Sequence, residues 1–105
     1  MAGTEMNTAI SAKEILKVLA TLKVEARQKY KAEIKGIFGS YVRGDAREGS
    51  DVDILVEFDE DANLIDFIGL SLFLEEKLHR SVDVVPVSAI RDEIKANILK
   101  EAAYL

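Results

Sequence analysis

The chain has 105 residues, of which 49% are hydrophobic and 31% are charged, and it carries a formal net charge of −5. This length and composition predict one folded domain with its own core and exclude a disordered chain. The acidic balance suits a cation or a basic protein partner, and it argues against direct nucleic-acid binding, which needs a surplus of Lys and Arg facing the phosphates.

The first part of the chain predicts a long helix, a strand and a short helix, in that order. Ser11 and Glu14 have the spacing of a capping box, and the apolar residues that follow recur at helical spacing, so we expect a helix from Ser11 to the late twenties. A short apolar run over residues 34–38 stops at a glycine and predicts a strand. The serine that follows this glycine then caps a brief helix over residues 40–43.

The middle of the chain predicts a loop, a second strand and a second long helix. Residues 44–50 are rich in Gly, Ser and charge, as surface loops are, and residues 52–58 alternate with period two. Asn63 is a favourable N-cap for a helix over residues 64–78. The acidic run 59–61 closes the strand, and we assign it no functional role.

The helix over residues 64–78 is unusually apolar for a small domain. One stripe on it consists of Leu64, Ile65, Ile68 and Leu72, and other faces carry Phe67, Leu70 and Leu74. Two explanations stay open. Either a partner protein buries one of these faces, or the domain's own fold covers the helix on several sides.

The last part of the chain predicts a third strand and a closing helix. Residues 82–85 form a short apolar run that ends at Pro86. We expect a helix to the end of the chain, because apolar residues then recur at helical spacing, namely Ile90, Ile94, Ile98, Ala102 and Leu105. Strands that alternate with helices in this order predict an α/β fold.

The sequence also excludes several cellular contexts. It contains no cysteine, so disulfides and thiolate metal sites are excluded and folding has no dependence on an oxidising compartment. Residues 1–8 lack the basic and apolar segments of a signal peptide, and no run approaches the roughly 18 apolar residues of a membrane-spanning helix. We therefore expect a cytoplasmic protein without membrane contact, and a loosely ordered tail over residues 1–10.

Three aspartates are candidate metal ligands. Asp51 and Asp53 are two residues apart on a predicted strand, so their side chains leave the same face with their origins roughly 6.6 Å apart. Carboxylates this close repel each other unless a cation offsets their charge. Asp83 stands alone in an apolar run, and it joins the pair if the third strand lies beside the second. Carboxylate, water and phosphate oxygens are ligands that Mg²⁺ prefers, whereas zinc is disfavoured by the lack of cysteine and the single histidine.

A candidate phosphate-binding segment precedes these aspartates. Gly39 lets the backbone approach a ligand closely, and Ser40 offers a hydroxyl and free backbone N–H groups to an anion such as a triphosphate. Arg43, one turn further, is placed to counter the charge of the same phosphates. A Gly-Ser pair alone is more often a turn, and two aspartates alone more often solvate a strand edge. Their combination with Asp83 favours a nucleotide site and metal-assisted phosphoryl or nucleotidyl transfer.

The same residues carry a resemblance to a known family. Residues 38–44 read FGSYVRG and residues 50–56 read SDVDILV, which closely resembles the signature of the DNA polymerase beta-like nucleotidyltransferase superfamily. More narrowly, the chain resembles the minimal nucleotidyltransferase group. The likeness continues through residues 64–68, 82–86 and 98–102, so it extends over nearly the whole chain.

This resemblance implies a single nucleotidyltransferase domain over residues 1–105, built on a small mixed sheet of three or four strands flanked by about four helices. It implies ATP as a substrate, two Mg²⁺ ions as cofactors, and transfer of AMP to an acceptor hydroxyl with loss of pyrophosphate. Members of the minimal group typically serve as antitoxins that are encoded with a HEPN ribonuclease toxin, bind it and, in characterised cases, adenylylate one of its tyrosines. We therefore expect a HEPN-domain toxin as the partner, in a homo- or hetero-oligomeric assembly.

Carried onto this chain residue by residue, the resemblance assigns the catalytic and metal-binding roles to Asp51, Asp53 and Asp83. The first two would hold both metal ions, while Asp83 would hold the catalytic ion and help to deprotonate the acceptor hydroxyl. Gly39 and Ser40 would orient the triphosphate.

Two other functions stay open. The chain could block a toxin by contact alone, with idle aspartates, or it could modify a small molecule, as the nucleotidyltransferases that inactivate aminoglycosides do. Those enzymes share the motif but generally carry an additional domain for the acceptor, for which this chain has no residues left. The sequence determines neither the acceptor residue, nor the nucleotide preference, nor the number of protomers.

Overall fold

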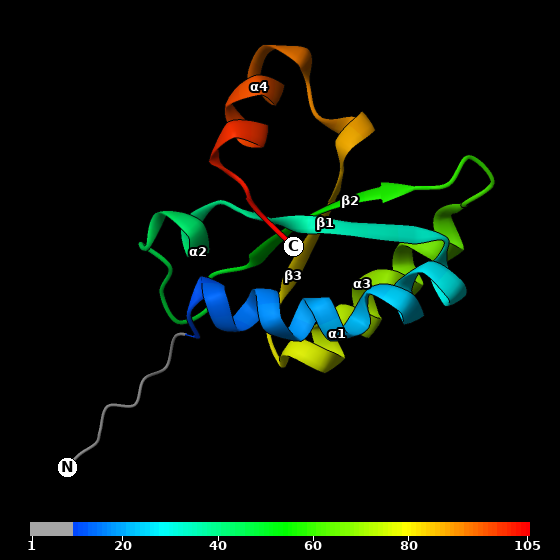
Figure 1. Ribbon diagram of the computed structural model, residues 1–105, viewed down its shortest axis with the longest axis horizontal. Helices are drawn as coiled ribbons and strands as arrows, with labels where there is room; N and C mark the ends of the chain where they lie inside the picture. Colours follow the sequence, from blue (N-terminus) through cyan, green and yellow to red (C-terminus); the bar gives the residue numbers. More distant parts are fainter. Residues whose placement is uncertain (1–9) are drawn as a thin grey trace.

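The computed structural model describes residues 10–105, so nearly all of the predicted N-terminal tail lies outside the described residues. The described part forms a sheet with helices on both sides (Figure 1). Its elements are α1 (Ala12–Tyr30), β1 (Ala32–Phe38), α2 (Ser40–Arg43), β2 (Val52–Phe58), α3 (Leu64–Leu78), β3 (Val82–Pro86), the 3-10 helix η2 (Val87–Ala89), α4 (Asp92–Glu101) and β4 (Ala103–Tyr104). Within residues 10–105, no helix is long and apolar enough to cross a membrane.

Four strands form one mixed sheet in the order β3-β2-β1-β4. β1 runs antiparallel to both β2 and β4, whereas β2 and β3 are parallel. A parallel pair needs a long crossover between its strands, and α3 supplies it. The expected mixed sheet flanked by helices is therefore confirmed, with four strands.

The core lies between one face of the sheet and the helices α1 and α3, while α4 stands on the other side of the sheet (Figure 1). Its fully buried large side chains are Ile15, Leu19, Ile34, Ile37, Val52, Ile54, Val56, Leu70 and Leu74. Each contributes roughly 2 kcal/mol through removal of apolar surface from water. The period of 3.6 in the helices and of 2 in β2 places these residues on one side of each element. In β1, Ile34 and Ile37 both reach the core although they are three residues apart, because the pairing with β2 shifts between Ile34 and Gly36.

Both long helices begin with a capping box. In α1, the Ser11 hydroxyl accepts a hydrogen bond from Glu14 N–H at 3.1 Å, and the Glu14 carboxylate accepts one from Ser11 N–H at 3.1 Å. In α3, Asn63 and Asp66 form the same reciprocal pair, with both distances at 3.0 Å. These bonds satisfy N–H groups that have no partner within the helix, so both predicted helix starts are confirmed.

The predicted helix to the end of the chain is wrong beyond Glu101. The chain leaves α4 there and forms β4, which pairs with β1 opposite Gly36. A side chain at Gly36 would clash with the Ala103 carbonyl oxygen, so glycine is what lets the two strands meet. The free edge of β1 offers backbone partners that a longer helix would leave unused, and Leu105 N–H donates to the Lys35 carbonyl at 3.0 Å.

Replacing Gly36 with Ala should displace β4. The added methyl group would meet the backbone of Ala103 and Tyr104, which cannot rotate away as a side chain could. We expect the free energy of unfolding to fall by about 2 kcal/mol, measured by urea denaturation. Gly49→Ala is the control, because the space around Gly49 is open and only its positive φ of 87° opposes a side chain, at about 1 kcal/mol. Equal losses in the two variants would contradict the clash at β4.

Candidate active site

The sheet brings two of the three candidate aspartates onto neighbouring strands. Asp53 lies on β2 and Asp83 on β3, and the two are direct partners in the parallel register. Asp51 lies one residue before β2 begins, rather than on the strand as expected. Asp53 is partly buried, whereas Asp51 and Asp83 are exposed. The condition that the third strand lies beside the second is met, so the three carboxylates belong to the same end of the sheet.

Gly39 brings the end of β1 against the Asp53 carboxylate. Its φ of 83° and ψ of −150° define a backbone conformation that is almost confined to glycine. A Cβ atom at this position would clash with the Oδ2 atom of Asp53. The approach follows from the β1–β2 register, in which Phe38 is the partner of Asp53. The chain therefore turns off β1 directly beside the partly buried carboxylate.

The short helix α2 is held at both ends by glycine. The Gly39 carbonyl accepts hydrogen bonds from Val42 N–H and Arg43 N–H, both at 3.0 Å. Gly44 ends the helix with a φ of 87° and donates to the Ser40 carbonyl at 2.9 Å. The prediction that Ser40 caps this helix is wrong by one residue, because Gly39 occupies the cap position and Ser40 is the first helical residue.

Glu101 lies in this site although the sequence analysis did not select it. One of its carboxylate oxygens accepts a hydrogen bond from Gly39 N–H at 3.1 Å, and the other lies 3.5 Å from Nη1 of Arg43. Arg43, which was expected to face phosphates, also contacts Asp45 at 3.5 Å. No motif spacing identifies Glu101, because 62 positions separate it from Gly39 and it occupies an ordinary polar position of a helix.

These groups surround a pocket of about 320 Å³ between β1, α2, β2 and α4. Its lining residues are Phe38, Gly39, Arg43, Asp53, Asn97, Ile98 and Glu101. The last three come from α4, so this helix forms one wall of the candidate site. This pocket contains the carboxylates of Asp53 and Glu101 and the guanidinium of Arg43. Such a combination suits a ligand that carries cations and phosphates together.

Asp53 is the carboxylate most affected by its surroundings. Burial raises its pKa from 3.8 to about 6, with further contributions in the same direction from the negative charges of Asp83 and Asp51. The positive charge of Arg43 opposes the rise. The raised pKa expresses the cost of holding several carboxylates together and partly out of water, which a cation at this end of the sheet would remove.

The donor atoms fit Mg²⁺ in kind but do not form a complete cage. Carboxylate oxygens are ligands that Mg²⁺ prefers, and the crowding that raises the pKa of Asp53 is what a divalent cation relieves. In the part of the chain that the structure describes, however, no group of three or more His, Cys, Asp or Glu side chains is arranged to hold a metal ion. Water and phosphate oxygens commonly complete the coordination of this ion. The metal-binding roles of Asp51, Asp53 and Asp83 therefore stay predictions.

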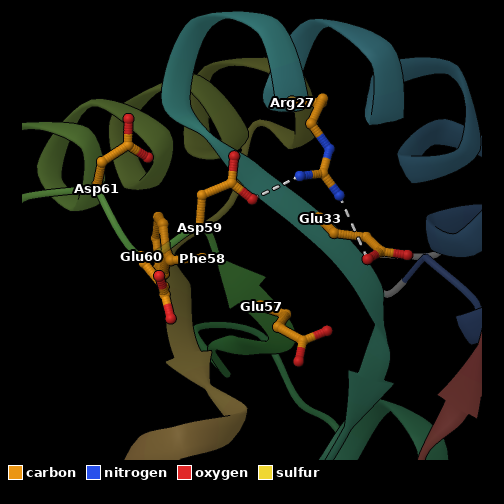
Figure 2. A pocket seen from close by; sticks show the side chains of 7 residues that line it. All are labelled: Arg27, Glu33, Glu57, Phe58, Asp59, Glu60 and Asp61. Atoms are coloured by element: carbon orange, nitrogen blue, oxygen red, sulfur yellow. Dashed lines mark hydrogen bonds and ion pairs between the residues drawn. The ribbon is translucent and has the colours of Figure 1, made fainter.

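A larger pocket of about 500 Å³ lies at the opposite end of the β1–β2 pair, where acidic side chains surround Arg27 (Figure 2). Arg27 contacts Asp59 at 2.7 Å and Glu33 at 3.4 Å, and Lys31 contacts Asp61 at 3.6 Å. These ion pairs join α1 to β1 and to the turn after β2. The acidic run, to which we assigned no role, thus takes part in contacts within the fold, away from the three candidate aspartates.

Comparison with known proteins agrees with the fold. A model of the nucleotidyltransferase domain matches residues 13–105. Over 96 residues, the chain is 42% identical to the protein adenylyltransferase MntA of Thermococcus cleftensis, an alignment that covers 91% of this chain and 97% of that protein.

Solved structures share the same architecture. One described as a minimal nucleotidyltransferase is 31% identical, with a TM-score of 0.76 over 94% of this chain and all of that one. The fold is also shared with a chain from the complex of a tri-AMPylated Shewanella oneidensis HEPN toxin with an MNT antitoxin. That comparison gives a TM-score of 0.63 and 18% identity over 89% of this chain and 70% of the other, and it concerns the fold alone.

Asp53→Asn should stabilise the metal-free protein at neutral pH. The pKa of Asp53 is raised to about 6 in the folded state, so the folded state binds more protons than the unfolded state between about pH 4 and 6, and stability falls as pH rises through this range. Asparagine carries no charge at this position, so the variant does not lose stability as the pH rises. Allowing for partial solvent exposure, we expect a gain of about 1 kcal/mol at about pH 7.5 and none below about pH 4, measured by thermal unfolding in EDTA.

Glu60→Gln is the control for this experiment, because it removes one negative charge from an exposed turn remote from the site. It should leave the stability nearly unchanged at both pH values. An equal gain from Asp53→Asn at high and low pH would contradict the electrostatic explanation.

Proposed function

This chain belongs to the nucleotidyltransferase domain family, and we propose that it is a protein adenylyltransferase that acts as an antitoxin. Its substrates are then ATP and a hydroxyl group of a HEPN-domain toxin, a tyrosine hydroxyl in our proposal. One observation carries this proposal: the backbone of Gly39 meets the Asp53 carboxylate beside Asp83, in a chain 42% identical to a protein adenylyltransferase. We place the reaction in the cytoplasm, where ATP is available and a chain without cysteine needs no oxidising conditions.

The aspartates have distinct roles in the proposed transfer. The acceptor oxygen attacks the α-phosphorus of ATP as the bond to pyrophosphate breaks, so the reaction needs positioning and charge neutralisation rather than a covalent intermediate. Asp83, exposed on β3, accepts the proton of the acceptor hydroxyl. Asp51, Asp53 and Asp83 would hold Mg²⁺, which when bound supplies positive charge to the phosphates. The exposure of Asp83 suits an acceptor that belongs to another protein.

The segment after β1 is the proposed triphosphate site. Gly39 allows close approach of the backbone, and Ser40 contributes its hydroxyl and N–H groups to the phosphate oxygens. Arg43 is the basic residue among those that line the pocket. The Asp53 carboxylate meets the backbone of Gly39, so a triphosphate bound at this segment lies beside that carboxylate.

The outer face of α3 is the surface that we propose for the toxin. Its exposed fractions are 70% for Leu64, 78% for Ile65, 49% for Ile68 and 62% for Leu72. Of the two explanations for this apolar helix, the described fold leaves this stripe uncovered, which favours a partner. Glu60 and Asp61 precede the stripe and Glu76 follows it, so the toxin surface should be aliphatic with Lys or Arg at its border.

The same exposed face favours a second candidate function, an antitoxin that acts by contact alone. Binding through α3 requires none of the aspartates, which lie at the strand ends of the sheet. The two functions differ in one measurable outcome, because only adenylyl transfer increases the mass of the toxin.

Incubation with ATP and Mg²⁺ should add one or more AMP units to the HEPN-domain toxin proposed as the partner, measured by intact-mass spectrometry. The matched control is the variant Asp51→Asn, Asp53→Asn, which keeps the α3 face and should form the complex without adding AMP. Complex formation without any gain in mass by the unmodified chain would favour the contact function. Transfer to an aminoglycoside without transfer to a protein would favour a small-molecule enzyme.

Replacing Ile65 and Leu72 with Asp should weaken the complex. Each buried aliphatic side chain contributes about 1.5–3 kcal/mol, so the dissociation constant should rise at least about tenfold, measured by titration calorimetry. Val24→Asp is the matched control, since Val24 is 68% exposed on α1 and outside the stripe. Equal dissociation constants for the unmodified chain and the double variant would rule out the α3 face as the toxin surface.

A further inference from the structure

The Glu101 carboxylate contacts the proposed triphosphate segment at the N–H of Gly39, where the segment begins, and at Arg43. Gly39 N–H donates to one of its oxygens at 3.1 Å, and Arg43 lies 3.5 Å from the other. All three residues line the pocket that also contains Asp53. An anionic side chain of the protein therefore stands where a phosphate oxygen is proposed to bind.

We propose that Glu101 is an internal occupant of the phosphate subsite and that the nucleotide binds by displacing it. This inference rests on the proposed function, because it names the group that the triphosphate must replace. Carboxylate and phosphate oxygens accept the same charge-assisted hydrogen bonds from N–H donors. Since both are anions, a carboxylate and a phosphate repel each other when they contact the same donors.

The ion pair between Glu101 and Arg43 is weak enough to be exchanged. The side chains of Arg43 and Glu101 are 51% and 31% exposed and 3.5 Å apart, and ion pairs of this kind contribute little to stability. A triphosphate carries several negative charges, and guanidinium groups bind phosphates through two parallel hydrogen bonds. The nucleotide therefore competes well for Arg43.

Displacement of Glu101 requires a movement of its side chain or of α4. No residue of α4 is fully buried, so close packing does not hold this helix against the sheet. The chain that follows α4 is anchored, because β4 pairs with β1. We therefore expect α4 to shift when the nucleotide enters, while β4 stays in place.

Titration calorimetry with MgATP and with inorganic triphosphate tests the displacement. Glu101→Gln keeps an acceptor for Gly39 N–H but removes the charge, so this variant should bind both ligands about fivefold more tightly, equivalent to about 1 kcal/mol. Glu93→Gln is the matched control, since Glu93 lies on the same helix and forms an exposed pair with Arg91 at 3.3 Å. It should bind both ligands as the unmodified chain does.

Hydrogen exchange of the unmodified chain provides a readout that needs no variant. MgATP should increase amide exchange in α4 and leave that of β4 unchanged. The displacement is overturned if Glu101→Gln binds the ligands equally or more weakly. Weaker binding would make Glu101 a positioning residue for Arg43. Slower or unchanged exchange in α4 on binding of MgATP would overturn it as well.

Failure of this inference is distinguishable from failure of the proposed function. If the unmodified chain binds MgATP and adenylylates the toxin while Glu101→Gln binds more weakly, only the displacement is rejected. If the unmodified chain binds no MgATP, adenylyl transfer itself is rejected, and the displacement with it.

Discussion

The approach of the Gly39 backbone to the Asp53 carboxylate is the constraint on which the candidate site depends. The β1–β2 register sets Phe38 opposite Asp53, so the chain can leave β1 only by passing beside that carboxylate. A side chain at Gly39 would clash there, and the positive φ of this residue excludes most alternatives. The same turn starts α2 and directs the Gly39 N–H toward the Glu101 carboxylate. Gly39 thereby links the β1–β2 register, the start of α2 and the position of Asp53.

The two faces of the central strand β2 have different roles. Val52, Ile54 and Val56 are fully buried against the helices and stabilise the fold. Asp53 points away from that core and is the partner of Asp83 across the parallel pair, where burial, and then repulsion from neighbouring carboxylates, raise its pKa. The buried face supplies enough stability to hold carboxylates in an unfavourable arrangement, as is common at sites that bind cations.

Much of the fold could be predicted because its signals are local. The capping box at Ser11 and Glu14 and the cap at Asn63 identify helix starts from residues three positions apart. The elements expected over residues 40–43, 52–58 and 64–78 are confirmed. The observed bounds of β1 and β3, the other two strands of the site, lie within two residues of the expected bounds. The prediction that Asp83 would join the pair was conditional, since a strand signal does not state which strands are neighbours.

The sequence by itself determined the elements, the core faces and the Gly-Ser and Asp-x-Asp motif, because hydrophobic period, caps and motif spacing act between residues close in the chain. Tertiary structure alone decided that β4 replaces the end of the last helix, that Glu101 reaches Gly39, and that the α3 stripe stays exposed. Each of these depends on contacts between distant segments or on their absence. Such contacts follow from how the elements pack around one sheet, which local patterns do not encode.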